Sequence, residues 1–273
     1  MAFRAMSFNI RGASHPEDGV NHWPQRAPLN VATIRQHAPD LIGFQELERG
    51  NLDTYEAELT DYRYILGNDA SDHSEHPSIF WKPSALDLLA SGGFWISETP
   101  EVYSGSWNTD CVRAATWARF RDQASGVTFL YLNTHLDHRS AWARREGCRL
   151  IVCRSADLRQ PDLPVLLTGD FNCNAHQNTD LADENYRFLV GSGFVDTYLA
   201  AGSVDSAHST TFHDFQGDQF VPEPSEGVKR IDWMLTLDGA RRWQVQSAAI
   251  IRENAAPIYP SDHYPITAQF SFL

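Results

Sequence analysis

Alternating hydrophobic and polar positions predict that the chain begins with a strand. In residues 2–10, every second side chain from Met6 to Ile10 is apolar, and Ser7 and Asn9 stand between them. A period of two residues is typical of a strand that buries one face. Runs with similar strand character are predicted at 40–46, 62–66, 78–82, 114–120, 127–132, 164–172, 210–215, 230–236, 244–251 and 265–272.

Helical patterns are fewer and more widely spaced. Helices are predicted for 28–37, 140–159 and 183–190. Pro28 suits a first helical turn, Pro39 fixes the end of that helix, and Ser140 is a suitable N-cap for the second. Many strands with few helices favour two packed, mainly antiparallel sheets flanked by helices over a doubly wound parallel sheet. Because no repeat or Gly/Ser-rich linker divides the chain, we expect one domain over 1–273.

Composition and charge narrow the classes of partner. Hydrophobic residues make up 42% and charged residues 21% of the chain, as in a soluble globular protein. The formal net charge of -13 disfavours tight, sequence-independent binding to long nucleic acid through a basic surface. A metal ion could still reverse the sign locally inside an acidic cleft.

The cysteines and the N-terminus indicate a reduced, membrane-free setting. Cys111, Cys148, Cys153 and Cys173 lack the spacing of a metal-binding motif, and a chain of this size does not need disulfides. No apolar stretch approaches the roughly 20 residues of a membrane span. The first residues enter a strand pattern without the features of a signal peptide. We therefore expect a cytoplasmic protein and a monomer.

A polar pair ends the apolar run at 164–172. This run predicts a buried strand that exits at Gly-Asp-Phe-Asn. With Phe171 turned away, Asp170 and Asn172 can both point out of the strand end, offering a carboxylate and a carboxamide. That pair suits a hard cation and the orientation of a water or phosphate oxygen. Asp and Asn also end strands for turn reasons, so the segment alone leaves both interpretations open.

Polar residues stand in apolar context at the ends of other predicted strands. They are Asn9, Glu46, His135, Asp232, Asp262 and His263. One such residue is ordinary, but so many at successive strand ends predict one shared site at the rim of a sandwich.

Each of these residues also has a structural alternative. Asn9 could cap the turn that follows it, and Glu46 could be a solvated charge at a strand end. His135 could be a satisfied structural histidine, and the Asp262-His263 pair could form a turn before Pro265. Asp232 would be costly as a lone buried charge, so it needs a partner under either interpretation.

Four motifs together carry a family resemblance. Gln-Glu, Asn-Thr-His, Gly-Asp-Phe-Asn and Ser-Asp-His-Tyr-Pro, in this order, resemble the endonuclease/exonuclease/phosphatase superfamily of metal-dependent phosphoesterases. The resemblance runs from Asn9 to His263 and so covers nearly the whole chain. It implies a four-layered α/β sandwich. Segments 94–100 and 133–138 further resemble a bacterial deadenylase-like branch of stand-alone hydrolases.

The resemblance implies a Mg2+ or Mn2+ cofactor and a hydrolytic water. Glu46 would be the principal metal ligand, because a carboxylate suits a hard cation that keeps several waters. Asn9 and Asp262 would complete the metal site, with Asn9 also within reach of the substrate. Asp170 would orient or deprotonate the attacking water, and Asn172 would hold that water or a phosphate oxygen.

The same resemblance implies that two histidines meet the substrate. His263 would contact the scissile phosphate, and Asp232 would orient it by accepting the proton of its other ring nitrogen. His135 would be a second phosphate contact or a proton donor to the leaving group. Arg113 could reach the substrate phosphate, or it could form an ion pair with a neighbouring carboxylate.

Several further residues are weaker candidates. Glu75 matches a position where the family places an acidic residue near the catalytic histidine. Glu48 could lie just outside the metal ligands or be a solvated charge. Trp107 and Trp23 could stack on a base or sugar, although core or surface packing is the better explanation.

Three functions remain open on the sequence. The first is a divalent-metal-dependent phosphodiesterase or phosphatase, which attacks phosphorus with an activated water on a small or lipid-like phosphoester. The second is a 3′ exonuclease acting on short single-stranded RNA or DNA. The third is a non-catalytic binding protein that retains the fold. The acidic charge favours a small or short phosphoester over a long duplex, and the complete set of acids and histidines counts against the third.

Overall fold

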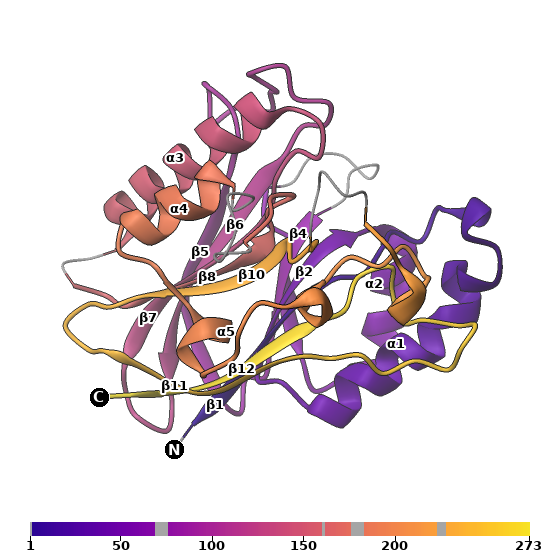
Figure 1. Cartoon of the computed structure of the whole chain (residues 1–273). Helices are drawn as coiled ribbons and strands as arrows, with labels where there is room; N and C mark the ends of the chain where they lie inside the picture. Colours follow the sequence, from indigo (N-terminus) through magenta and orange to yellow (C-terminus); the bar gives the residue numbers. More distant parts are fainter. Residues whose placement is uncertain (1, 69–75, 160–161, 176–182, 223–227) are drawn as a thin grey trace.

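Two six-stranded sheets lie face to face, and helices cover the outer face of each (Figure 1). The computed structural model describes residues 2–68, 76–159, 162–175, 183–222 and 228–273. The arrangement of helix, sheet, sheet and helix is the four-layered α/β sandwich that the sequence predicted. Glu75 lies outside the described residues. None of the helices in the described ranges is long and apolar enough to cross a membrane.

The first sheet has the strand order β11-β12-β1-β2-β4-β3. Its strands are β1 (Phe3–Asn9), β2 (Leu41–Leu47), β3 (Arg63–Ile65), β4 (His76–Trp81), β11 (Trp243–Ile250) and β12 (Ile266–Phe272). Helices α1 (Trp23–His37) and α2 (Arg49–Glu58) pack on its outer face. The core between them includes Met6, Phe8 and Ile10, so the apolar face read from the β1 sequence is the face that meets the helices.

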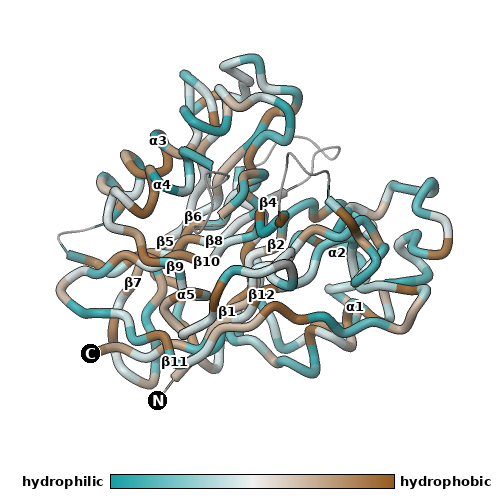
Figure 2. Tube along the Cα trace, in the orientation of Figure 1, coloured by the Kyte–Doolittle hydropathy of each residue, from teal (hydrophilic) through white to brown (hydrophobic). Residues whose placement is uncertain are grey.

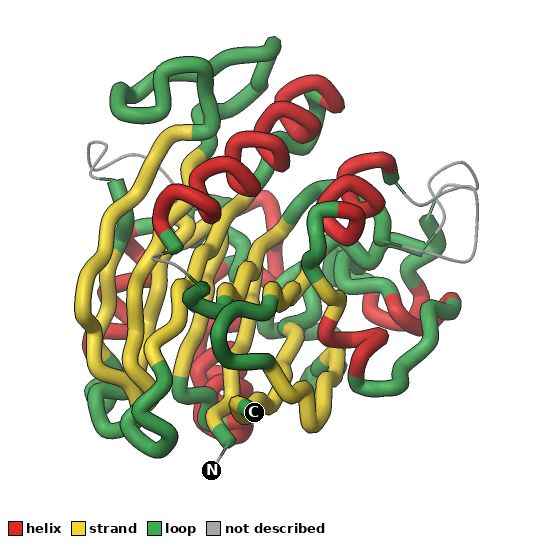
Figure 3. Tube along the Cα trace, turned by 90° about the vertical axis from the view of Figure 1, so that its left-hand side faces the viewer, coloured by secondary structure: helices red, strands yellow, loops and turns green. Residues whose placement is uncertain are grey.

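The second sheet has the strand order β5-β6-β7-β8-β10-β9. Its strands are β5 (Leu86–Trp95), β6 (Ala114–Asp122), β7 (Thr128–His135), β8 (Val165–Asp170), β9 (Val195–Asp196) and β10 (Asp232–Leu237). Helices α3 (Ala141–Leu158) and α4 (Glu184–Gly191) cover its outer face, as Figure 3 shows for the strands and helices together. Smaller elements are α5 (Thr197–Ala200), η1 (Pro16–Asn21), η2 (Ala207–Ser209) and η3 (Gly217–Gln219).

An aromatic-rich core fills the space between the sheets. Phe3, Phe120, Phe129 and Trp243 are buried there, and the hydropathy of the chain is highest along such strand segments (Figure 2). The pairs β1–β2 and β7–β8 are parallel and the other described strand pairs are antiparallel, which confirms the predicted character of the sheets. The two parallel pairs matter most for function, because their carboxyl ends meet at one edge of the sandwich.

Several elements differ from the sequence prediction. Helix α1 begins at Trp23 with Pro24 in its first turn, so Pro28 lies inside the helix and not at its start. The pattern missed α2, whose buried residues are only Asn51, Leu52 and Tyr55. It also missed β5, a strand at the edge of its sheet with a largely part-exposed middle. An edge strand and a mostly polar helix bury too few side chains to produce a clear period.

The predicted strand at 210–215 is wrong. This segment forms a single isolated bridge between Phe212 and His263. Asp214 and Phe215 then take left-handed backbone angles, with φ of 49° and 55°, which no strand accommodates. The segment is a connector between the two sheets, and its contacts bear directly on the site described next.

Candidate active site

Strand register brings three predicted site residues together in the second sheet. Asp170, the last residue of β8, lies opposite His135 of β7 and opposite Asp232 of β10. All three side chains are buried. One carboxylate at the end of the central strand therefore has a histidine on one side and a second carboxylate on the other.

The first sheet supplies the other half of the site. Asn9 of β1 pairs with Gln45 of β2, so Asn9 and Glu46 emerge at the same sheet edge. The Asn9 Nδ2 atom donates to Glu46 Oε1 at 2.9 Å and to Asp170 Oδ2 at 3.0 Å. Asn9 thus links the two sheets at the point where the predicted metal and hydrolytic groups meet. Its Oδ1 atom accepts from the backbone N–H of Arg11.

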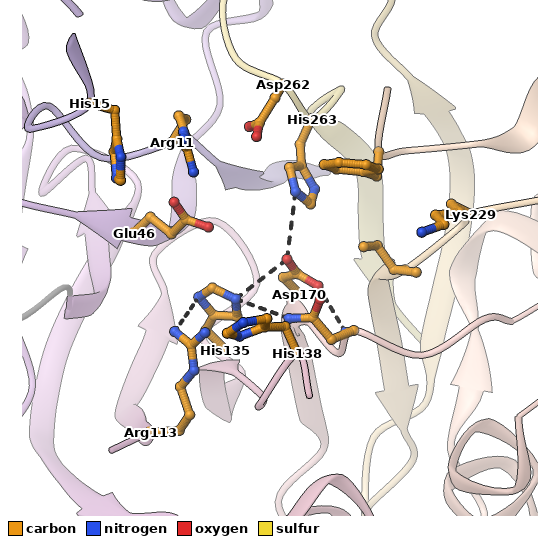
Figure 4. A pocket seen from close by; sticks show the side chains of 13 residues that line it. Arg11, His15, Glu46, Arg113, His135, His138, Asp170, Lys229, Asp262 and His263 are labelled. Carbon is orange, nitrogen blue, oxygen red and sulfur yellow. Dashed lines mark hydrogen bonds and ion pairs between the residues drawn. The ribbon is translucent and has the colours of Figure 1, made fainter. Parts of the chain in front are cut away.

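Most of the predicted site residues line a cleft of about 490 Å³, whereas Asn9 and Asp232 are buried and are not part of its lining (Figure 4). The lining includes Glu46, Arg113, His135, Asp170, Asn172, Asp262 and His263, all of them predicted site residues. It also includes residues that the sequence analysis did not propose, namely Arg11, His15, His138, Phe212, Lys229 and Ile231. The structure therefore assembles the predicted set in one place and adds positive charge and an apolar wall to it.

Asp170 lies at the centre of the hydrogen bonds in the cleft. Its Oδ2 atom is 3.5 Å from His135 Nε2 and 3.7 Å from His263 Nε2, and its Oδ1 atom accepts from the backbone N–H of Asn172 at 2.9 Å. Burial, followed by the nearby charge of Asp232, raises the pKa of Asp170. A carboxylate with a raised pKa is a better proton acceptor than a solvated one.

His263 is held as a cation. Its Nδ1 atom donates to Asp232 Oδ2 at 2.9 Å. Burial alone would lower the pKa of His263, but Asp232, with smaller contributions from Asp170 and Asp262, raises it to about 10. The predicted pairing of Asp232 with His263 is therefore present as a contact, and it fixes both the charge and the orientation of the ring.

His135 is held neutral. Arg113 NH1 lies 3.0 Å from His135 Nδ1, and since a guanidinium can only donate, this ring nitrogen accepts. Burial and the charge of Arg113 lower the pKa of His135 to about 4. The proton of the neutral ring then sits on Nε2, which faces Asp170 Oδ2 at 3.5 Å.

Glu46 and Asp262 form an oxygen-rich corner of the cleft. Among the described residues, neither carboxylate has an ion-pair partner within 4.0 Å. Burial would raise the pKa of Glu46, but His135, the hydrogen bond from Asn9 and His263 outweigh this and lower it, so the group stays ionised. Two carboxylates beside a carboxamide fit a hard divalent cation.

A second cluster of potential ligands fits a metal less well. Ligand atoms of Asp170, Asp232 and His263 lie within 4.8 Å of one another. The Nδ1 atom of His263 is already engaged by Asp232, and a cationic imidazole has no free lone pair to offer. The corner formed by Glu46 and Asp262 is therefore the better candidate.

A buried arginine joins the two loops that carry the metal corner. Arg26 of α1 donates to the carbonyl oxygens of Ile10 at 2.6 Å, Gly12 at 3.1 Å and Pro260 at 3.1 Å. It thereby ties the segment after Asn9 to the segment before Asp262. No sequence signal identifies it, because an arginine on a helix is normally expected at the surface.

Thr211 holds the segment that carries Asp232. Its Oγ1 atom accepts from the backbone N–H groups of Ile231 at 3.0 Å and Asp232 at 3.1 Å. Its carbonyl oxygen accepts from the backbone N–H of Tyr264 at 2.7 Å. One threonine therefore connects the two strands whose ends supply the Asp232–His263 pair, which explains why this segment is a connector and not a strand.

Glu48, Trp107 and Trp23 are not part of the cleft lining. Glu48 accepts from the backbone and hydroxyl of Ser14, and Trp107 packs against the core beneath α3. Trp23 is buried and donates to Gly50 O and Thr54 Oγ1. The packing explanation holds for both tryptophans.

Comparisons with known proteins agree with this geometry. A model of the Endonuclease/Exonuclease/phosphatase family matches residues 6–263. A solved endonuclease/exonuclease/phosphatase from Bacteroides vulgatus is 30% identical with a TM-score of 0.85, and the match covers 100% of both chains. A mannosyl-6-phosphatase from Bacteroides thetaiotaomicron is 29% identical with a TM-score of 0.83 and covers 99% of both chains.

More distant structures share the fold alone. TDP2 from D. rerio, solved with a single-strand DNA product, is 18% identical with a TM-score of 0.74 over 99% of both chains. A search of curated proteins finds no match. Nothing in these comparisons singles out the bacterial deadenylase-like branch. The match of the family model across most of the chain, together with the site at the sheet edge, shows that the chain belongs to the endonuclease/exonuclease/phosphatase family.

Proposed function

We propose that this protein is a divalent-metal-dependent hydrolase of small phosphoesters, which attacks phosphorus with a water activated by Asp170. One observation carries the proposal: the Asp170 carboxylate lies between a neutral and a cationic histidine, beside the two carboxylates of Glu46 and Asp262. Such a site combines a base, fixed positive charge and ligands for a hard cation in one cleft.

Each residue has a role that follows from its contacts. The raised pKa of Asp170 suits it to accept a proton from the attacking water, while the Asn172 backbone N–H keeps the carboxylate oriented. His263 donates to a phosphoryl oxygen, and Asp232 keeps the ring protonated and aligned. His135, neutral with its proton on Nε2, fits a phosphate contact better than a proton donor to the leaving group. With a pKa of about 4 the ring is neutral near pH 7, and the N–H of a neutral imidazole is too weakly acidic to protonate a leaving group.

Glu46 and Asp262 would hold Mg2+ or Mn2+, with Asn9 adjacent. When bound, such an ion polarises the phosphoryl group and neutralises developing negative charge. Arg113 supports the site from behind by its contact with His135 Nδ1.

Small phosphoesters are favoured over nucleic acid. The net charge of -13 opposes binding of a long polyanion, and the mannosyl-6-phosphatase at 29% identity offers a precedent for a sugar phosphate. A 3′ exonuclease on short single strands is the second candidate, favoured by the apolar wall of Phe212 and Ile231, on which a base could stack. A non-catalytic binding protein is disfavoured by the complete set of hydrolytic groups.

A metal titration and a substrate panel test the proposal. Turnover should vanish with EDTA and return with Mg2+ or Mn2+, and full activity in metal-free buffer would refute the mechanism. Glu46→Ala should abolish calorimetric binding of Mn2+ while the protein stays folded, with Glu58→Ala, an exposed glutamate paired to Arg35, as the matched control. The panel sets bis-p-nitrophenyl phosphate, nucleotides, inositol phosphates and mannose 6-phosphate against oligonucleotides and poly(A). Turnover of the oligonucleotides alone would favour the exonuclease.

A further inference from the structure

Arg11 is a cleft cation that the proposed hydrolytic groups do not use. It directly follows the β1 strand and the turn that begins at Asn9. Its side chain lines the cleft, and Figure 4 shows it in the region between the carboxylates of Glu46 and Asp262. The side chain is 26% exposed, so solvent and ligands can reach it.

The guanidinium of Arg11 is held in one orientation. Its Nε and NH2 atoms donate to the two carboxylate oxygens of Asp18 at 3.1 and 3.0 Å, and the Asp18 side chain is only 7% exposed. Its backbone is fixed as well, because the N–H donates to Asn9 and the carbonyl oxygen accepts from Arg26. The bidentate contact with Asp18 uses one edge of the guanidinium and leaves NH1 outside that pair.

Arg11 places a fixed positive charge next to the corner formed by Glu46 and Asp262. Burial would lower the pKa of the guanidinium, but its hydrogen bonds to Asp18 and the charges of Asp262 and Glu46 raise that pKa, so Arg11 stays a cation. A planar guanidinium with a second set of N–H donors is suited to an oxyanion of phosphorus. An arginine oriented in advance loses less conformational freedom on binding than a free surface arginine.

We propose that Arg11, oriented by Asp18, forms a subsite for a phosphate dianion and makes the cleft select terminal phosphomonoesters over phosphodiesters. This inference rests on the proposed function, since it assigns the class of phosphoester to the same cleft. A phosphomonoester presents three non-bridging oxygens and two charges near pH 8, whereas a diester presents two oxygens and one charge. His263, His135 and a metal held by Glu46 would contact phosphoryl oxygens in the proposed function, and Arg11 would add a further N–H donor and a further positive charge, which match the third oxygen and the second charge of a monoester.

The apolar side of the cleft is consistent with a leaving group of modest size. Lys229 lies with its Nζ atom 5.5 Å from the centre of the Phe212 ring, beside Ile231. This wall offers a ring face and one further cation. The proposed subsite at Arg11 does not include these residues, so Arg11 can be substituted without changing this wall.

Equilibrium binding to the Mg2+-loaded protein tests the inference without requiring turnover. The probes are inorganic phosphate, a dianion at pH 8, and dimethyl phosphate, a monoanion that lacks the third free oxygen. Arg11→Met should weaken phosphate binding by about tenfold or more, the loss expected for one charged hydrogen-bonding group, and should change dimethyl phosphate binding by less than about threefold. Arg11→Lys, which keeps the charge but loses the fork, should fall between the wild type and Arg11→Met.

Matched variants keep the result interpretable. Arg121→Met removes an arginine that is likewise paired through Nε and NH2 with an aspartate, Asp87, but on strands outside the cleft, and should leave both affinities unchanged. Lys229→Met removes a cation from the opposite wall and should weaken both probes by similar factors. Equal loss of both probes in Arg11→Met, or unchanged phosphate binding, would overturn the subsite. If no phosphoester in the panel is hydrolysed, the proposed function fails, while the binding comparison still decides on the subsite.

Discussion

His135 and His263 lie in the same cleft and face the same oxygen, yet one ring is neutral and the other is a cation. Their Nε2 atoms are 3.5 and 3.7 Å from Asp170 Oδ2, and both side chains are buried. The pKa of His135 is lowered to about 4 and that of His263 is raised to about 10. The difference comes from the other ring nitrogen, which meets Arg113 in one case and Asp232 in the other.

The comparison shows that burial alone does not set the charge of a histidine in this cleft. Burial lowers the pKa of both rings, and the largest cause after burial is the charge of the group at Nδ1, which is Arg113 for His135 and Asp232 for His263. The cleft thereby gains one hydrogen-bond donor that is neutral and one that is a permanent cation, on either side of a single base. Such an arrangement supplies positive charge at the phosphate without placing a second cation beside Arg113.

Removing His263 or its partner Asp232 should have the largest effect on catalysis. His263→Ala and Asp232→Asn should each reduce kcat/KM by roughly a thousandfold or more, because the first removes the donor and the second removes the group that charges and orients it. The double variant should be little worse than either single one. Kinetics of the three variants on a phosphoester that the wild type hydrolyses provide the measurement.

A buried aspartate outside the cleft serves as the control for this set. Asp122 caps the turn after β6 by accepting from Ser125, and Asp122→Asn should leave kcat/KM near the wild-type value while lowering stability. Additive losses of activation free energy in the double variant would mean that Asp232 and His263 act independently, and the pairing would then be abandoned.

Removing Arg113 should make His135 easier to protonate, so that its charge becomes more like that of His263. In Arg113→Met, the guanidinium no longer disfavours a protonated ring, so the pKa of His135 should rise by about one unit or more. An NMR titration of the ring C–H signals in metal-free protein measures this, with the His135 signal assigned through His135→Gln. We expect kcat/KM to fall by about tenfold, less than for His263→Ala, because the ring remains in place.

The two histidines lose their contributions to the free energy of unfolding in opposite directions of pH. Folded His135 binds protons less readily than the unfolded chain, so its contribution to the free energy of unfolding is lost as pH falls from about 6.5 to about 4. Folded His263 binds protons more readily, so its contribution is lost as pH rises from about 6.5 to about 10. Denaturant unfolding of Arg113→Met should show a shallower decline on the acid side only. An unchanged acid decline would remove Arg113 as its cause.

The strand ends of the site could be predicted from the sequence, because a polar residue after a buried apolar run stands out. Asn9, Glu46, Asp170 and Asp232 were identified in this way, and parallel register then placed two of the strand ends together. The roles of these residues remain predictions until variants are measured, as does the single domain over 1–273.

The supporting residues could not be predicted, because their signals resemble those of ordinary surface positions. Arg26 lies in a helix with polar neighbours, and only the folded structure shows that its guanidinium is buried among backbone carbonyl groups. Arg11 looked like part of a turn. The charge of each histidine depends on a residue far away in sequence, 22 positions for Arg113 and 31 for Asp232, which no local pattern reports.

Removing the Thr211 hydroxyl, which holds the backbone at Asp232, should have the smallest effect on activity. It should change the pKa of His263 and leave the pKa of His135 unchanged. Thr211→Val preserves the shape of the side chain but leaves the backbone N–H groups of Ile231 and Asp232 without their acceptor. Two unsatisfied buried donors should lower the free energy of unfolding by about 1–3 kcal/mol and kcat/KM by only several-fold. Because Asp232 becomes less well fixed, the pKa of His263 should fall, so the alkaline loss of activity should begin at lower pH. Thr211→Ser, which keeps the hydroxyl, should restore the profile, and the NMR titration of His135 should not change. A shift in the pKa of both histidines would show that Thr211 supports the whole cleft and not the Asp232–His263 pair alone.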